Sequence, residues 1–288
     1  MARGPQLGTI LTAVVTPFDD SLAVDEGAFV DLMAHLARNG SDGFVVCGTT
    51  GEASTLSDEE HLRVVELAVD ERPEGTTVVA GAGSNDTRHA VDMTERVCAL
   101  GVDALLSVTP YYNRPNRRGI LAHYTEIARA ADRPIVLYNI PQRTALDLPN
   151  DLLAELAQLD HVDAVKQANP DNLALVDGLD LYAGNDDLLA PTLDLGGAGG
   201  VLTASHVVGQ EFRRMLDAPD DRAAIDAELS DVYAALSVAP LAVTIKAALN
   251  LMGVRAGVPR LPYVEADEAE TQTIREMLDA RGLVGAHA

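Results

Sequence analysis

Residues 134–168 read PIVLYNIPQRTALDLPNDLLAELAQLDHVDAVKQA, and this stretch decides the fold class. Its two short runs, 134–141 and 162–168, have the apolar and alternating patterns of β-strands. Between them, residues 149–159 carry apolar side chains at helical spacing. A strand, a helix and a second strand in this order predict parallel strands joined by a right-handed crossover.

The same alternation extends in both directions along the chain. Strand-like runs are Gly8–Phe18, Asp42–Gly48, Thr76–Gly83, Asp103–Pro110, Pro134–Pro141, Val162–Ala168, Asp180–Gly184 and Gly199–Ser205. Helix-like runs are 25–40, 57–72, 86–100, 117–132, 149–159, 170–178, 187–196 and 207–217. Eight such units without a break predict a closed (β/α)8 TIM barrel of the α/β class.

The pattern changes after residue 218. Three helix-like runs follow at 219–236, 240–253 and 266–282, with no Gly, Ser or Pro-rich linker before them. We therefore expect residues 1–218 to form the barrel. Residues 219–288 are expected to form a helical appendage packed on it within one structural unit.

The amino-acid composition limits the classes of partner that the protein can have. The formal net charge of −23 repels nucleic acid and anionic membranes, so neither is an expected partner. No apolar stretch reaches membrane-spanning length, and we expect a cytoplasmic protein. Cys47 and Cys98 are interpreted as small core residues. The seven histidines are scattered and none pairs with an acid at ligand spacing, so we expect neither a metal nor a cofactor.

Lysine is scarce: Lys166 and Lys246 stand against nineteen arginines. An amine can lose its proton and attack a carbonyl to form a Schiff base, whereas a guanidinium stays protonated. Lys166 ends the strand-like run 162–168, and Lys246 lies in a helix-like run. A functional role for Lys166 competes with a simpler reading, in which it pairs with a nearby acid.

Unusual residues gather at the predicted strand ends, where the active sites of parallel barrels lie. They are Gly48-Thr-Thr-Gly-Glu52, Thr109-Pro-Tyr-Tyr-Asn-Arg-Pro115, Tyr138-Asn-Ile-Pro-Gln-Arg143, Lys166, Gly184-Asn-Asp186 and Gly199–Ser205. Each has an ordinary explanation as a turn or a loop. Together they favour one site.

These groups suit a single reaction. A neutral Lys166 would attack a 2-oxo acid, and the resulting iminium would make the adjacent carbon an enamine nucleophile. Tyr138, Thr49 and Tyr112 could relay the protons that dehydration requires.

Two further groups could hold carboxylates. Thr50, together with Thr49 and the glycine turn, can offer hydroxyl and backbone N–H groups to the carboxylate of the oxo acid. Arg143 could bind a second carboxylate through its bidentate fork.

The chain resembles the dihydrodipicolinate synthase / N-acetylneuraminate lyase family of class I aldolase-type TIM barrels. The resemblance spans nearly the whole chain. Its motifs are Gly48-Thr-Thr-Gly-Glu52, Tyr111-Tyr-Asn-Arg-Pro115, Tyr138-Asn-Ile-Pro-Gln-Arg-Thr144, Lys166, Lys246-Ala-Ala-Leu and Arg260-Leu-Pro262. Within the family, Arg143 favours a synthase that condenses pyruvate with aspartate semialdehyde in lysine and diaminopimelate biosynthesis.

The resemblance also implies residue roles. Lys166 would form the Schiff base, Tyr138 would donate and accept protons, and Thr49 and Tyr112 would complete the relay. Tyr112 would reach in from a neighbouring subunit, as expected of a homotetramer built as a dimer of dimers. Substrate contacts would come from Thr50, Arg143, Gly184 and the backbone at Val201.

The sequence departs from the family in places. Gln-Ala-Asn-Pro follows Lys166 where an acid is usual, and Gly184-Asn-Asp replaces Gly-Asp-Asp. The family's effector site for lysine is matched by His61, Asn85 and Tyr111. There Asp58 and His89 replace a His and a Glu, and we expect weak or absent inhibition by lysine.

Two other functions compete. A retro-aldol lyase of a 2-keto-3-deoxy sugar acid, such as 2-keto-3-deoxygluconate, would use the same Lys166 imine to cleave a carbon–carbon bond. A non-catalytic binding module would keep the barrel, but the presence of both Lys166 and Tyr138 argues against it.

Overall fold

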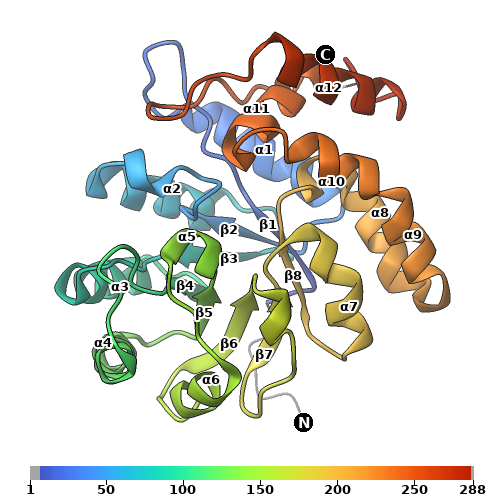
Figure 1. Ribbon diagram of the computed structural model, residues 1–288. Coiled ribbons are helices and arrows are strands. Elements are labelled where there is room, and N and C mark those ends of the chain that lie inside the picture. The colour runs from blue at the N-terminus through green and yellow to red at the C-terminus, as the bar shows by residue number, and fades with distance from the viewer. Residues whose placement is uncertain (1–6, 287–288) are drawn as a thin grey trace. The chain divides into compact units, whose positions relative to one another are not determined.

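The computed structural model describes residues 7–286, and its eight strands have the order of a closed barrel, β1 to β8 (Figure 1). The strands are β1 (Ile10–Ala13), β2 (Gly43–Val46), β3 (Thr77–Gly81), β4 (Ala104–Val108), β5 (Ile135–Asn139), β6 (Val162–Gln167), β7 (Asp180–Ala183) and β8 (Gly199–Leu202). Pairing is parallel from β3 through β8. The predicted (β/α)8 barrel is therefore confirmed.

Helices follow the strands and continue past the last of them. They are α1 (Glu26–Arg38), α2 (Asp58–Glu71), α3 (Thr87–Ala99), α4 (Arg117–Ala130), α5 (Pro141–Thr144), α6 (Asn150–Leu156), α7 (Leu189–Asp194), α8 (Ser205–Asp217), α9 (Arg222–Glu228), α10 (Ser230–Leu236), α11 (Leu241–Met252) and α12 (Glu268–Asp279). Short 3-10 turns are η1 (Ala53–Thr55), η2 (Pro170–Asn172), η3 (Asp186–Leu188) and η4 (Pro219–Asp221).

The described residues divide into two compact units. The first comprises residues 7–11 and Thr77–Leu202, which include strands β3 to β8. The second comprises Thr12–Thr76 and residues 203–286, which include β2, α1, α2 and α8 to α12. A division of the chain at residue 218 stays a prediction.

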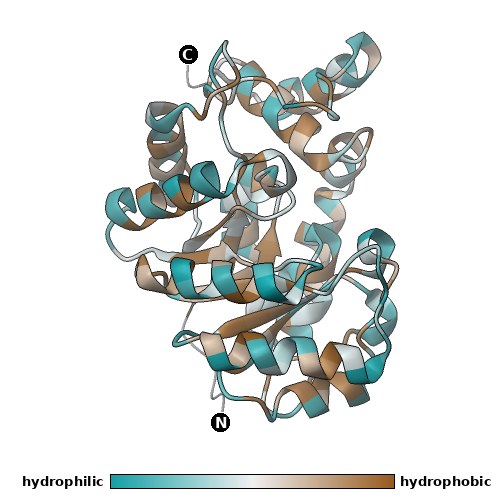
Figure 2. Ribbon diagram, turned by 90° about the vertical axis from the view of Figure 1, so that its left-hand side faces the viewer, coloured by the Kyte–Doolittle hydropathy of each residue, from teal (hydrophilic) through white to brown (hydrophobic). Residues whose placement is uncertain are grey.

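In the first unit, the strands are buried almost throughout, as expected of parallel strands that are covered on both faces. Figure 2 shows these strands as mainly hydrophobic, while the helices alternate between hydrophobic and hydrophilic turns. The pairing of β5 with β6 sets Tyr138 opposite Lys166, and the pairing of β6 with β7 sets Lys166 opposite Tyr182. The register thus places Lys166 between two tyrosines.

In the second unit, α11 packs against α12, and α12 against α10. The helix α12 buries Ile274, Met277 and Leu278, which lie three or four residues apart on one face. Capping boxes begin two of the helices. Ser57 and Glu60 form the box at α2 that the sequence Ser57-Asp-Glu-Glu60 predicts, and Asp267 forms another with Glu270 at α12.

Some sequence predictions were wrong in extent. The expected helix at 170–178 is only the turn η2, followed by an antiparallel bridge between Val176 and Leu179. Asn169 accepts a hydrogen bond from the Asp171 backbone, which favours a local turn over a helix. Asn172 donates to Asp147, 25 residues earlier, which ties this segment to another part of the chain. The expected helix at 219–236 is broken into η4, α9 and α10.

Both cysteines are buried and free, as expected. Within residues 7–286, no single helix is long and apolar enough to cross a membrane. The helices α10 and α11 meet that test only as a pair, which is bent by 109°.

We predict that Asp267→Ala lowers the Tm by a few degrees. The substitution removes the side chain that caps the Glu270 N–H, at a cost of about 1 kcal/mol. Asp267→Asn is the matched control, because an amide oxygen still caps a helix. Thermal unfolding followed by circular dichroism measures both, and equal losses in the two variants would contradict the capping role.

Candidate active site

Lys166 lies in β6 with only 6% of its surface exposed. Its Nζ is 4.1 Å from the centroid of the Tyr138 ring, which comes from the neighbouring strand β5. Paired residues of adjacent strands point to the same face, so the strand register itself brings amine and phenol together. In the simpler alternative, Lys166 pairs with a nearby acid; no ion pair of Lys166 is present among residues 7–286, although the charge of Asp186 acts on its amine.

Burial determines the charge of this amine. Desolvation lowers the pKa of Lys166 to about 7; the charge of Asp186 acts against this shift, and that of Arg143 acts with it. A large share of the side chain is therefore neutral near pH 7. A neutral amine is the form that attacks a carbonyl.

The pKa of Tyr138 is shifted upward, opposite to that of Lys166. Burial raises the pKa of its phenol to about 12, although the charge of Arg143 acts to lower it. The phenol therefore keeps its proton at neutral pH. It can donate that proton to an oxygen that is bound beside Lys166.

A tight turn after β5 positions Arg143. The short helix α5 follows β5 directly, and the hydroxyl of Thr144 donates to the carbonyl of Ile140 or Leu146 within it. Arg143 itself is exposed, yet its charge influences both Lys166 and Tyr138. The turn thus presents a cation close to the buried amine and phenol.

A polar cluster, which sequence reasoning missed, braces the strands β5 and β6. Asn139 is fully buried and donates to Asp147 Oδ1 and to Gln167 Oε1, each at 2.9 Å. Gln167 Oε1 also accepts from the Asn169 backbone at 3.0 Å. Gln167 is the residue that replaces the family's usual acid, and here its amide oxygen is satisfied by two donors. The sequence did offer one sign of this cluster, since the polar residues Asn139 and Gln167 end strands that are otherwise largely apolar.

Gly184 and Val201 belong to the same unit as Lys166. The Gly184 N–H donates to the Gln167 carbonyl at 2.7 Å. A Cβ on Gly184 would lie 2.7 Å from Ala168 N, so no other residue fits without a shift of the backbone. Val201 is buried in β8.

Tyr112 is 91% exposed and has a φ of +72°, which is strained for a residue with a Cβ. The preceding Tyr111 is tied to Asn85, whose side chain donates to the Tyr111 carbonyl at 3.2 Å. Asn113 returns a bond to the Asn85 carbonyl at 2.8 Å. The structure therefore brings together two of the three predicted effector residues, Asn85 and Tyr111.

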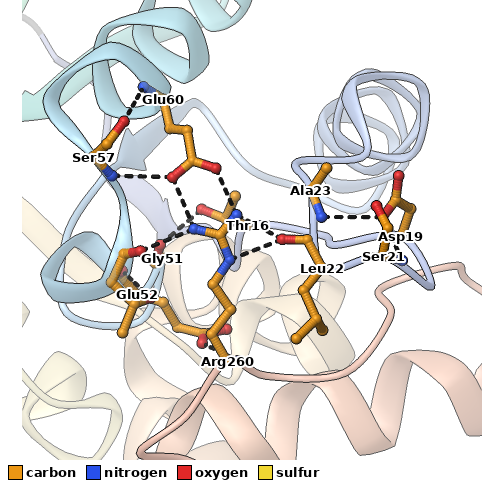
Figure 3. Close-up of polar contacts among 11 residues, drawn as sticks. Thr16, Asp19, Ser21, Leu22, Ala23, Gly51, Glu52, Ser57, Glu60 and Arg260 are labelled. Atoms are coloured by element: carbon orange, nitrogen blue, oxygen red, sulfur yellow. Dashed lines mark hydrogen bonds and ion pairs between the residues drawn. The ribbon is translucent and has the colours of Figure 1, made fainter.

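Thr49, Thr50 and His61 belong to the second unit. Thr49 and Thr50 follow β2; Thr49 is exposed and Thr50 is buried. The Thr16 hydroxyl donates to the Gly51 carbonyl at 2.7 Å and so braces this loop (Figure 3). His61 lies in the first turn of α2, where its carbonyl faces the thiol of Cys47.

Metal ligands are not grouped in the part of the chain that the structure describes. Among residues 7–286, no three His, Cys, Asp or Glu side chains are arranged to hold an ion.

Lys166→Met should raise the Tm more at pH 6 than at pH 9. The unfolded chain keeps this amine protonated up to about pH 10, whereas the native chain releases the proton near pH 7. The native state is therefore disfavoured most at low pH and recovers as pH rises above 7. The difference in stabilisation between the two pH values is on the order of 3 kcal/mol. Thermal unfolding of both proteins at each pH measures it, and the same gain at both would exclude a depressed pKa.

The comparisons with known proteins agree with this geometry. Residues 6–281 match the Dihydrodipicolinate synthetase family. The chain is 39% identical to 4-hydroxy-tetrahydrodipicolinate synthase of Heliobacterium modesticaldum, over 96% of this chain and 97% of that protein.

Two solved structures are similar over nearly their whole length. Lysine-bound DHDPS from Cyanidioschyzon merolae has a TM-score of 0.92 and 38% identity, over 96% of this chain and 99% of that one. Chloride-inhibited dihydrodipicolinate synthase from Acinetobacter baumannii, complexed with pyruvate, has a TM-score of 0.92 and 29% identity, over 96% and 100%. The fold, the buried lysine and these matches together establish that the chain belongs to the dihydrodipicolinate synthetase family.

Proposed function

We propose that this protein is a 4-hydroxy-tetrahydrodipicolinate synthase, a lyase that condenses pyruvate with L-aspartate 4-semialdehyde. The reaction belongs to lysine and diaminopimelate biosynthesis. The observation that carries the proposal is the buried amine of Lys166, whose pKa is lowered to about 7, beside the protonated phenol of Tyr138. The relatives that match over full length carry the same name.

The first half of the reaction activates pyruvate. Lys166 Nζ attacks the C2 carbonyl of pyruvate, and the oxygen takes up a proton from Tyr138. The attacking nitrogen returns a proton to the Tyr138 phenolate, which donates it to the new hydroxyl, so that water leaves. An iminium remains, and it withdraws electrons from C3. Removal of a C3 proton then gives an enamine that can act as a carbon nucleophile.

The second half forms the carbon–carbon bond. The enamine carbon attacks the aldehyde carbon of the semialdehyde, whose oxygen becomes a hydroxyl. The amino group of the new chain then attacks the iminium carbon. Ring closure expels the Lys166 amine and yields the cyclic product, so no redox step or external cofactor enters the balance.

The remaining assignments follow from the family resemblance. Thr49 and Tyr112 would join Tyr138 in the proton relay. Thr50 and the backbone at Val201 would hold the pyruvate carboxylate, and Gly184 would leave room for the substrate.

Arg143 is proposed to bind the carboxylate of the semialdehyde. It is exposed, and its charge reaches both Lys166 and Tyr138. A guanidinium binds a carboxylate through two parallel hydrogen bonds, which orients the aldehyde as well as holding it. A polyhydroxylated sugar acid would instead need hydroxyl-binding groups at this position.

A homotetramer, built as a dimer of dimers, is part of the proposal, with a cytoplasmic location. Tyr112 supports the assembly because its ring is almost fully exposed on a strained backbone. Strain of this kind persists where surrounding contacts stabilise it, and a second subunit would supply them. Weak or absent inhibition by lysine at the site of His61, Asn85 and Tyr111 stays a prediction.

Borohydride trapping with pyruvate tests the reaction. We expect a reduced pyruvate adduct on Lys166, located by peptide mass, and turnover of aspartate semialdehyde in a coupled assay. Lys166→Met should abolish both, and Lys246, the only other lysine, should stay unmodified. An adduct without turnover of the semialdehyde would favour the sugar-acid lyase. No adduct on Lys166 would contradict the Schiff-base mechanism.

Mixing two inactive variants tests the shared site. In a dimer that exchanges Tyr112, a Lys166→Met subunit paired with a Tyr112→Phe subunit has one intact site. Random reassociation should therefore restore about a quarter of the wild-type activity, because half the dimers are mixed and each has one working site. Size-exclusion chromatography checks assembly. Mixed dimers without recovered activity would place Tyr112 in its own subunit's site or in none.

A further inference from the structure

The second lysine of the chain, Lys246, is buried in an ion pair. It lies in α11 with 1% of its surface exposed, and its Nζ is 2.6 Å from Oε1 of Glu52, whose side chain is fully buried. Nζ also donates to the Val258 carbonyl at 3.1 Å and lies 4.1 Å from the centroid of the Phe18 ring. An ionised side chain in a protein interior needs an opposite charge and hydrogen bonds of this kind to offset the cost of its desolvation.

Glu52 is held from two distant segments. Besides the ion pair with Lys246, its Oε2 accepts the Arg260 backbone N–H at 2.9 Å. Its own backbone has a φ of +55°, a conformation that costs free energy for any residue with a Cβ. The contacts of the carboxylate therefore hold a strained backbone in place.

Arg260 extends the same network to the far end of the loop. Its guanidinium binds Glu60 at 2.6 Å (Figure 3). It also donates to the Thr55 carbonyl at 2.8 Å. Its Cζ is 4.2 Å from the centroid of the Phe18 ring, so both cations contact this one ring. The segment from Glu52 to Glu60 is thus anchored at both ends.

Thr49 and Thr50 lie immediately before this anchor. The Glu52 N–H donates to the Thr49 carbonyl at 3.1 Å, and the Ala53 N–H donates to the Gly48 carbonyl at 3.3 Å. A Cβ on Gly51 would lie 3.0 Å from the Val14 carbonyl oxygen, so the loop has little room to move on that side. A shift of Glu52 would be passed directly to the backbone of the two threonines.

We infer that Glu52 and Lys246 are positioning residues, whose buried ion pair sets the Thr49–Thr50 backbone that receives the carboxylate of pyruvate. This inference rests on the proposed function. Both side chains are buried, so we expect neither to touch the substrate. The pair acts through the loop, and its loss should weaken pyruvate binding more than binding of the semialdehyde.

Lys246→Met is the principal variant. It leaves the Glu52 carboxylate buried without its partner, so the loop should move to bring that charge toward water. We expect the KM for pyruvate to rise by about tenfold or more, with a smaller change in the KM for the semialdehyde. The rate of borohydride trapping at low pyruvate should fall in parallel.

Two further variants separate positioning from stability. Glu52→Gln in the Lys246→Met background removes the unpaired charge, and this double variant should bind pyruvate better than Lys246→Met alone. Ile274→Ala creates a cavity in the core of the same unit at a residue that makes none of the loop contacts described above, and it should lower the Tm while leaving the KM for pyruvate unchanged. All assays are run at a fixed interval below each variant's Tm, so that every protein is folded.

The outcomes separate this inference from the proposed function. An adduct in the wild-type protein, with a KM for pyruvate in Lys246→Met no higher than in Ile274→Ala, overturns the positioning role alone. A double variant no better than Lys246→Met also overturns it. Absence of an adduct in the wild-type protein overturns the proposed function, and the positioning role with it.

Discussion

The desolvation of the Lys166 amine is the constraint on which the rest of this structure depends. The amine is buried in β6 between residues of β5 and β7, and burial brings its pKa into the neutral range. The strands must stay in register for Tyr138 to face it. The buried amide network of Asn139 and Gln167 next to the site helps to hold that register. The chemistry proposed for Lys166 therefore depends on the register in which β5 and β6 pair.

Burial lowers the pKa of both lysines, but their neighbours differ. The pKa of Lys166 falls to about 7, with the Tyr138 ring 4.1 Å from its amine and the charge of Asp186 acting against the shift. The pKa of Lys246 falls to about 8, because the Glu52 carboxylate at 2.6 Å opposes the desolvation. Breaking such a buried pair costs about 3–5 kcal/mol because it leaves one charge without its partner. The first environment makes a nucleophile, and the second makes a structural anchor for the loop of Thr49 and Thr50.

Sequence patterns predicted the structure correctly where contacts between residues close in the chain determine it. The capping box of Ser57 and Glu60 is present because its two hydrogen bonds lie within four residues. The expected helix at 170–178 is absent because Asn172 bonds to Asp147, a partner 25 residues earlier in the chain. The same limit applies to the site. Lys166, Tyr138 and Arg143 could be selected from strand ends, whereas the network of Asn139, Asp147 and Gln167 needed tertiary contacts to be seen.

The sequence by itself determined the alternation of strands and helices, and with it the barrel, because hydrophobic periodicity is local and repeats along the chain. Its scarcity of lysine also singled out Lys166 as the candidate nucleophile. Only the tertiary structure decided that the amine of Lys166 lies beside a phenol and that of Lys246 beside a carboxylate. A pKa depends on the solvent and the charges around a group, and these come from residues far apart in the chain, such as Glu52 and Lys246.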